Sequence, residues 1–104
     1  MIARIWQGAT PEAKAEQYLD YMRQTGVKEL RATEGNRGVY VLRRIDNGQA
    51  EFTFISLWES WEAIRRFAGD EVERAVYYPE DSDYLVSLTP QVTHYEVLVA
   101  PAEV

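Results

Sequence analysis

The stretch FTFISLWESWEAI, residues 52–64, decides the fold of this chain. Its first seven residues are mostly aromatic and β-branched, the types that favour strands. Ser60 is suited to cap a helix, and the apolar residues Ile64, Phe67 and Ala68 then share one helical face. A strand therefore passes straight into a helix, which is expected to end at Gly69.

The residues before this stretch predict a hairpin. Residues 38–45 form another strand pattern, and Asp46-Asn47-Gly48 separates it from residues 50–58. The Asn-Gly pair supplies the positive φ angles that a tight hairpin turn needs. The two strands are therefore expected to pair antiparallel.

The N-terminal third predicts one strand and one helix. Residues 2–7 favour a strand, and residues 8–10 favour a turn. Thr10 is the expected N-cap of a helix that has a proline at its first position. Gly26 is expected to end this helix as a left-handed cap, and residues 27–37 predict a loop.

The C-terminal third predicts a short helix, a loop and a strand. Asp70 and Glu73 resemble a capping box that starts a helix reaching about residue 77. Residues 80–83 predict an acidic, solvated loop, and residues 91–99 predict the last strand.

The resulting order is β-α-β-β-α-β, which predicts one α+β domain over residues 1–104 with a ferredoxin-like antiparallel sheet and helices on one face. Two helices cover only one face of such a sheet, yet residues 39–42 and 52–58 carry apolar side chains on both faces. A large uncovered apolar face marks an interaction surface. We therefore expect a homodimer formed through the sheet.

Composition excludes several functional classes. Eleven Lys and Arg against seventeen Asp and Glu give a net charge of −6, which opposes binding to nucleic acid or anionic membranes. The chain has no cysteine and one histidine, so neither a thiolate site nor a multi-histidine metal site is expected. No apolar run approaches the roughly 20 residues of a membrane span, and the N-terminus does not resemble a signal peptide. A cytoplasmic location is the expectation.

Two segments resemble a known family. SLWESWEAI at residues 56–64 and FAGD at residues 67–70 are similar to the strand-to-helix segment of the antibiotic biosynthesis monooxygenase superfamily. The resemblance extends over about residues 1–98 and implies a dimeric α+β barrel with a pocket between sheet and helices in each subunit. Some members oxidise aromatic, polyketide-like substrates with dioxygen and without metal, flavin or haem, whereas others bind and degrade haem.

The resemblance implies a substrate pocket walled by aromatic side chains. Trp58 matches the strand-end tryptophan of the superfamily, which is often a pocket residue; packing in the core or in a dimer contact is the alternative. Arginines 43 and 44 point to opposite faces of their strand, so one of them is expected to face an interior or the dimer seam. Pairing with a carboxylate of this acid-rich chain is the first expectation for it, and anchoring an anionic or enolate oxygen is the alternative. The expected substrate-binding residues are Trp58, Phe54, Tyr40, Arg44 and Phe67.

The candidate catalytic residues are Tyr77, Tyr78 and His94. The tyrosines are candidate hydrogen-bond donors or bases toward a phenolic substrate, or else they pack at the edge of the core. His94 is a candidate base near neutral pH, although a strand histidine is more often structural. Tyr77 falls close to where the haem-degrading branch places its axial histidine, which counts against haem degradation, as does the absence of asparagine from the first strand.

The expected function is that of a cofactor-independent monooxygenase acting on an aromatic or polyketide-like small molecule. A ligand-binding or sensing module that uses the same pocket without turnover is the first alternative. A haem-binding or haem-degrading relative is the second.

Overall fold

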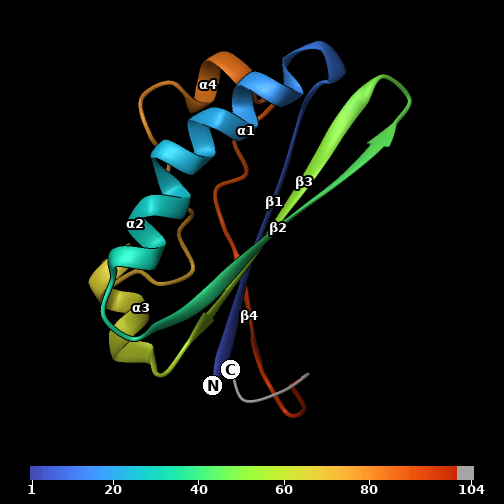
Figure 1. The fold of residues 1–104 in the computed structure, drawn as a ribbon. Coiled ribbons are helices and arrows are strands. Elements are labelled where there is room, and N and C mark those ends of the chain that lie inside the picture. Colours follow the sequence, from blue (N-terminus) through green and yellow to red (C-terminus); the bar gives the residue numbers. More distant parts are fainter. Residues whose placement is uncertain (101–104) are drawn as a thin grey trace.

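The structure of the protein is a computed structural model, and it describes residues 1–100. A four-stranded antiparallel sheet has the helices on one of its faces (Figure 1). The sheet order is β2-β3-β1-β4, so the expected α+β, ferredoxin-like architecture is confirmed. The elements are β1 (Ile2–Pro11), a 3-10 turn η1 (Glu12–Lys14), α1 (Ala15–Gln24), α2 (Gly26–Ala32), β2 (Asn36–Asp46), β3 (Gln49–Trp58), α3 (Trp61–Ala68), α4 (Asp81–Tyr84) and β4 (Thr93–Glu96).

The central hairpin and the helix that follows it form as expected. β2 pairs with β3 antiparallel, and the turn between them has φ of 52° at Asn47 and 78° at Gly48. Positive φ at both positions is the requirement of a type I′ turn, which matches the twist of the strands. The Ser60 hydroxyl accepts a hydrogen bond from the Ala63 amide at 3.2 Å and so caps α3.

The N-terminal segment differs from the prediction. β1 does not turn at residues 8–10 but continues to Pro11, because it stays paired with β3 as far as Gln49. Thr10 is therefore a strand residue, and its hydroxyl donates to the Pro11 carbonyl instead of capping a helix. The first helical turn begins only at Glu12.

Gly26 does not end the first helix. It begins α2, after an interruption at Thr25, so the predicted loop over residues 27–37 is wrong for its first half. Val27 and Leu30 are buried one turn apart, which is a short apolar helical stripe. A Cβ added at Gly26 would come within 3.6 Å of the Phe54 ring. The helix thus passes close to the aromatic side chains of the sheet.

The predicted helix over residues 70–77 is also wrong. Residues 72–73 form a turn, and the segment then runs beside residues 90–92, where the Ala75 amide donates to the Pro90 carbonyl at 2.9 Å. The helical turn forms instead at α4, in the stretch expected to be a solvated acidic loop, and its Asp81 is buried at 5% exposure. The last strand is shorter than expected, at residues 93–96.

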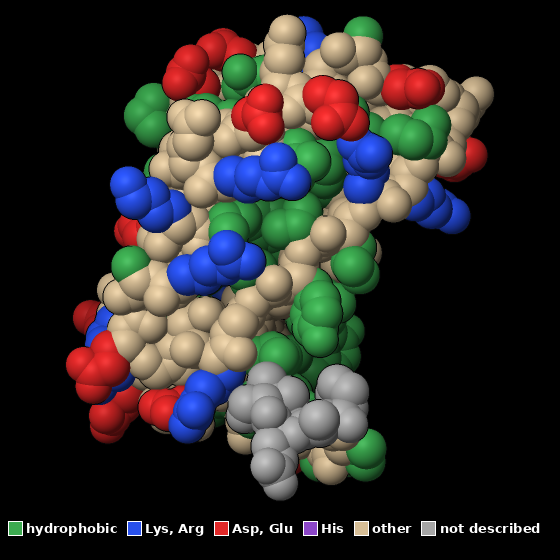
Figure 2. Space-filling view, viewed as in Figure 1, with side chains coloured by type: hydrophobic (Ala, Val, Ile, Leu, Met, Phe, Trp, Pro, Cys, Tyr) green, Lys and Arg blue, Asp and Glu red, His purple; other side chains and the backbone are tan. Residues whose placement is uncertain are grey.

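The two faces of the sheet have different surroundings. Phe52 and Trp58 point to the helices and are almost wholly buried, at 1% and 0% exposure. The opposite face bears apolar side chains that no described element covers, among them Tyr40, Leu42 and Tyr95, at 52%, 48% and 56% exposure. In the view of Figure 2, hydrophobic side chains are visible between the helices and the sheet, and acidic side chains gather at the end that carries α4. No helix within residues 1–100 has the length and apolar character to cross a membrane.

Candidate functional site

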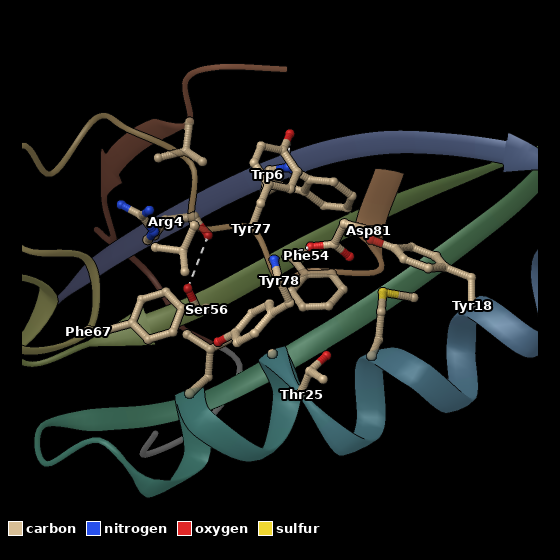
Figure 3. Close-up of a pocket in the computed structure, with 15 residues that line it drawn as sticks. Arg4, Trp6, Tyr18, Thr25, Phe54, Ser56, Phe67, Tyr77, Tyr78 and Asp81 are labelled. Atoms are coloured by element: carbon tan, nitrogen blue, oxygen red, sulfur yellow. Dashed lines mark hydrogen bonds between the residues drawn. The ribbon is translucent and has the colours of Figure 1, made fainter. Parts of the chain in front are cut away.

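A cavity of about 60 Å³ lies between the helix-covered face of the sheet and helices α1 and α2 (Figure 3). Strand alternation sends every second side chain of β1 and β3 toward it. Trp6 and Phe54 are partners across the two strands, and their rings meet edge to face at 5.5 Å. Arg4 and Ser56 form the next pair on the same face. The cavity wall is therefore mainly aromatic, with one basic residue beside it.

Tyr77 is held in the wall through its hydroxyl. This hydroxyl accepts a hydrogen bond from the Trp6 indole nitrogen at 3.1 Å and donates to the Thr89 carbonyl at 2.6 Å. The Tyr77 and Trp6 rings also meet edge to face at 6.3 Å. The hydroxyl thus fixes the two rings relative to each other, and its proton is already committed to Thr89.

Tyr78 also lines the cavity, but its hydroxyl points away to α2. It donates to Glu29 Oε2 at 2.7 Å. Burial raises the pKa of Tyr78 above its usual range, and the hydrogen bond and negative charge of Glu29 add to the rise. The phenol therefore stays protonated near neutral pH and is poorly suited to act as a base.

Asp81 is a buried carboxyl group at one end of the cavity. It begins α4, and its Oδ2 accepts a hydrogen bond from the Tyr78 amide at 2.6 Å. Burial raises the pKa of Asp81, and interactions with the Tyr78 amide and the Tyr18 hydroxyl partly offset that rise. The pKa of Tyr18 is raised in turn, first by its own burial and then by the charge of Asp81. A desolvated carboxylate with a raised pKa is a competent proton acceptor.

Arg4 is at the opposite end of the cavity, beside Phe67 (Figure 3). Its guanidinium lies over the Phe67 ring, 5.8 Å from the ring centre, and its side chain is only 4% exposed. Burial lowers the pKa of Arg4 to about 10, so the group remains cationic at neutral pH. The site is thus bipolar, with a cation at one end and a carboxyl group at the other.

His94 lies outside the cavity. It is on β4, where it pairs with Arg4 across the strands, and its Nε2 is 3.1 Å from Arg4 Nη1. Its ring also meets the Trp61 ring at 5.0 Å in a surface groove. Burial lowers the pKa of His94, and the positive charge of Arg4 lowers it further. His94 therefore contacts the site only through Arg4.

The five expected substrate-binding residues are not all in one place. Phe54 and Phe67 line the cavity. Trp58 is completely buried behind it, where its indole nitrogen donates to Ser56 Oγ at 2.9 Å and its ring contacts Phe67. Tyr40 and Arg44 lie on the opposite face of the sheet, and Arg44 pairs there with Glu51. Trp58 thus supports the wall, and two residues point away from it.

Sequence reasoning did not single out Arg4, Trp6 or Asp81. The first two could have been found, since residues 4 and 6 share a face of the predicted first strand and alternate with the apolar Ile5. Asp81 carried no such signal, because it lies among acidic neighbours that are typical of a solvated loop. Among residues 1–100, no group of three or more metal-ligating side chains is brought together.

Comparison with known proteins places this site in a family context. Residues 1–76 match the family described as antibiotic biosynthesis monooxygenase. No curated protein matches the chain. A Bacillus cereus protein assigned as an antibiotic biosynthesis monooxygenase superposes with a TM-score of 0.65 at 21% identity, covering 100% of this chain and 97% of that one. The heme-degrader MhuD from Mycobacterium tuberculosis, solved with two hemes in its active site, superposes with a TM-score of 0.65 at 16% identity, covering 98% and 100%.

At these identities the structural likeness supports the fold alone, whereas the family match rests on the sequence. That match includes β1, the helices α1 and α2, the β2–β3 hairpin and α3, and it extends to Val76 in the cavity wall. It spans well over half of the 104 residues. The chain belongs to the antibiotic biosynthesis monooxygenase family.

Proposed function

We propose that this protein binds a small aromatic molecule in the cavity and oxidises it with dioxygen without a bound cofactor. The observation that carries the proposal is the buried carboxyl group of Asp81, with its raised pKa, in a cavity walled by Trp6, Phe54 and Tyr77. Such a cavity provides stacking surfaces for an aromatic ring and one group that accepts a proton. Membership of the family supports oxygenase chemistry.

The reaction needs an activated substrate, such as an anthrone or a hydroquinone. Asp81 takes a proton from the acidic carbon or hydroxyl, and the resulting anion gives one electron to dioxygen. The two radicals combine through a new C–O bond, and the peroxide takes up the proton that Asp81 held. For an anthrone, loss of water then leaves a carbonyl, so that R₂CH₂ and O₂ become R₂C=O and H₂O. The protein binds, excludes water and moves a proton, and the substrate supplies the electrons.

The tyrosines expected to be catalytic have different roles in this proposal. Tyr77 positions Trp6, since its hydroxyl binds both that indole and a backbone carbonyl. Tyr78 contributes a wall and donates its amide to Asp81. His94 acts on the site only through Arg4. Asp81 therefore replaces the tyrosines and His94 as the proposed base.

A haem-dependent reaction does not fit the residues present. The only histidine of the chain, His94, is outside the cavity and contacts the Arg4 guanidinium. Tyr77, near the position expected for an axial ligand, has its hydroxyl hydrogen-bonded to Trp6 and Thr89.

Binding without turnover is the second candidate function. The commitment of both the Tyr77 and Tyr78 hydroxyls to protein partners favours it, because neither is free to polarise a substrate. It predicts saturable binding of aromatic molecules with no consumption of oxygen.

We further propose that two copies pack through the open faces of their sheets. The apolar side chains on that face, including Tyr40, Leu42 and Tyr95, are the surface that would be buried. A two-fold related copy presents the same apolar surface and is therefore self-complementary. Closing two sheets face to face would give the dimeric barrel.

Oxygen uptake tests the catalytic proposal. Protein freed of metal and haem is mixed with a panel of anthrones and hydroquinones, and the rate is compared with the uncatalysed rate. Asp81→Asn should lower the catalysed rate by at least a hundredfold, as expected for loss of a general base. Asp83→Asn, which removes an exposed charge two residues away, is the matched control and should leave the rate unchanged. Equal rates for the Asp81→Asn variant and the unmodified protein would reject Asp81 as the base, and binding without uptake would favour the second function.

A further inference from the structure

Arg4 is a buried cation without a counter-ion among the residues that the structure describes. Ion pairs within residues 1–100 use other arginines, such as Arg37 with Glu59 and Arg44 with Glu51, and all of these have exposed side chains. Burial is the cause of the lowered Arg4 pKa, and no carboxylate counters it. An uncompensated buried charge is costly, and no acidic side chain among residues 1–100 pairs with this one, so an anionic ligand would stabilise it.

The protein satisfies only part of the guanidinium. Nη1 donates to the Val72 carbonyl and lies 3.1 Å from His94 Nε2, and Nη2 donates to the Arg74 carbonyl at 2.9 Å. A guanidinium has five N–H groups, so two remain without a hydrogen-bond partner among the described residues, one on Nε and one on Nη2. These two nitrogens share one edge of the guanidinium, which is the edge that binds both oxygens of a carboxylate.

The rest of the cavity determines how an anionic ligand would lie. Asp81 is at the far end from Arg4 and would repel a second carboxylate there (Figure 3). Between them are the apolar faces of Trp6, Phe54 and Tyr77. A molecule with an acidic group at one end and an aromatic body would satisfy the cation, fill the aromatic section and present its other end to Asp81.

We propose that the ligand of this cavity is a small aromatic carboxylate whose acidic group pairs with Arg4. The inference rests on the proposed function, because it takes the cavity to be the binding site, and it adds the chemical class of the ligand. The neutral counterpart of such a molecule would leave the guanidinium uncompensated and should bind much more weakly.

The test uses 2-naphthoate and 2-naphthamide, which have nearly the same shape and differ in charge. Calorimetric titration of the unmodified protein should show at least tenfold tighter binding of the carboxylate. Arg4→Gln should bring the two affinities close to each other. Arg23→Gln removes an exposed arginine paired with Asp20 and is the matched control, which should keep the preference.

The outcomes separate this inference from the proposed function. Equal binding of amide and carboxylate would overturn the role of Arg4 while keeping an aromatic-binding cavity. Binding of neither probe would overturn both. A preference for the carboxylate that persists in Arg4→Gln would place the anion elsewhere and overturn the assignment.

Arg4 also holds the backbone at Val72 and Arg74, so Arg4→Gln puts the fold at risk. A second measurement therefore uses the unmodified protein. The Nε–H resonance of Arg4, assigned by its loss in Arg4→Lys, should shift on titration with 2-naphthoate and stay in place with 2-naphthamide. An unmoved resonance at saturation with 2-naphthoate would overturn the proposal.

Discussion

Arg4 Nη1 lies 3.1 Å from His94 Nε2, so a buried cation faces the imidazole directly. An N–H of Arg4 can donate to this nitrogen only while the nitrogen carries no proton. The contact therefore requires neutral His94. It also connects the wall of the cavity to the surface groove that His94 shares with Trp61.

We expect this contact to make the protein less stable in mild acid. Burial and the charge of Arg4 lower the pKa of His94, and Glu73 raises it by less. Because the unfolded imidazole has a pKa of about 6.5, the unfolded state takes up the proton first as the pH falls. The stabilisation is complete above about pH 6.5 and is lost as the pH falls through that value toward the folded pKa.

Urea unfolding at pH 7.5 and 5.5 measures this loss. The unmodified protein should lose more unfolding free energy across this interval than His94→Gln, in which no imidazole titrates. Because His94 is the only histidine, the difference between the two proteins isolates its contribution. An identical loss in both would contradict the assigned pKa shift.

Asp81 should have the opposite dependence on pH. Burial raises its pKa above the unfolded value of about 3.9, so the folded state binds the proton more tightly. Its contribution to stability is therefore complete below about pH 3.9 and is lost as the pH rises through the folded pKa. The stability of the unmodified protein relative to Asp81→Asn should fall between pH 3 and pH 7. Urea unfolding midpoints measured across this pH range test the prediction, and Asp83→Asn is the control at an exposed position. If the stability difference between the unmodified protein and Asp81→Asn stays constant or rises with pH, the raised pKa of a buried Asp81 is rejected.

Trp58 should matter for stability more than for ligand contact. Its side chain is fully buried, and its indole nitrogen donates to Ser56 Oγ. Trp58→Ala should cost about 3–5 kcal/mol of unfolding free energy, the range for large aromatic side chains removed from cores. Trp61→Ala removes a tryptophan that is 44% exposed and should cost less than about 1 kcal/mol. Chemical denaturation followed by circular dichroism compares them, and a similar small cost for both would show that Trp58 is not a core residue.

The sequence predicts the sheet better than the helices, and the reason is physical. The hairpin at Asn47-Gly48 and the cap at Ser60 are set by short-range chemistry, and both form as expected. Gly26 is different, because a glycine after a helix predicts its end from local preferences alone. Here Gly26 begins α2 instead, because Val27 and Leu30 of that helix are buried against the rest of the protein, a tertiary contact that local preferences do not contain.

The polar residues of the cavity were harder to predict than its aromatic wall. Phe54 and Phe67 follow from strand and helix periodicity, and both line the cavity. Asp81 becomes buried only because α4 packs near α1, where the rings of Tyr18, Tyr21 and Tyr84 come together. This is a contact between residues about 60 positions apart, and neither segment contains a local pattern that predicts it.

The exposed apolar face predicts the oligomeric state. Leu42 pairs with Thr53, and Tyr40 pairs with Ile55, so these side chains share the face opposite the helices. Sedimentation of the unmodified protein at micromolar concentration should give twice the 12.0 kDa mass of the chain. Leu42→Lys should shift the protein toward the monomer, because a charge in the centre of an apolar sheet contact must be desolvated.

Leu88→Lys is the matched control for that experiment. Leu88 is 46% exposed, close to the 48% of Leu42, but it belongs to no strand of the sheet. The same charge placed there should leave the dimer intact, since it lies outside the proposed interface. A strictly monomeric unmodified protein would reject packing through the sheet, and dissociation caused equally by both substitutions would show that added charge alone, not the face of the sheet, controls association.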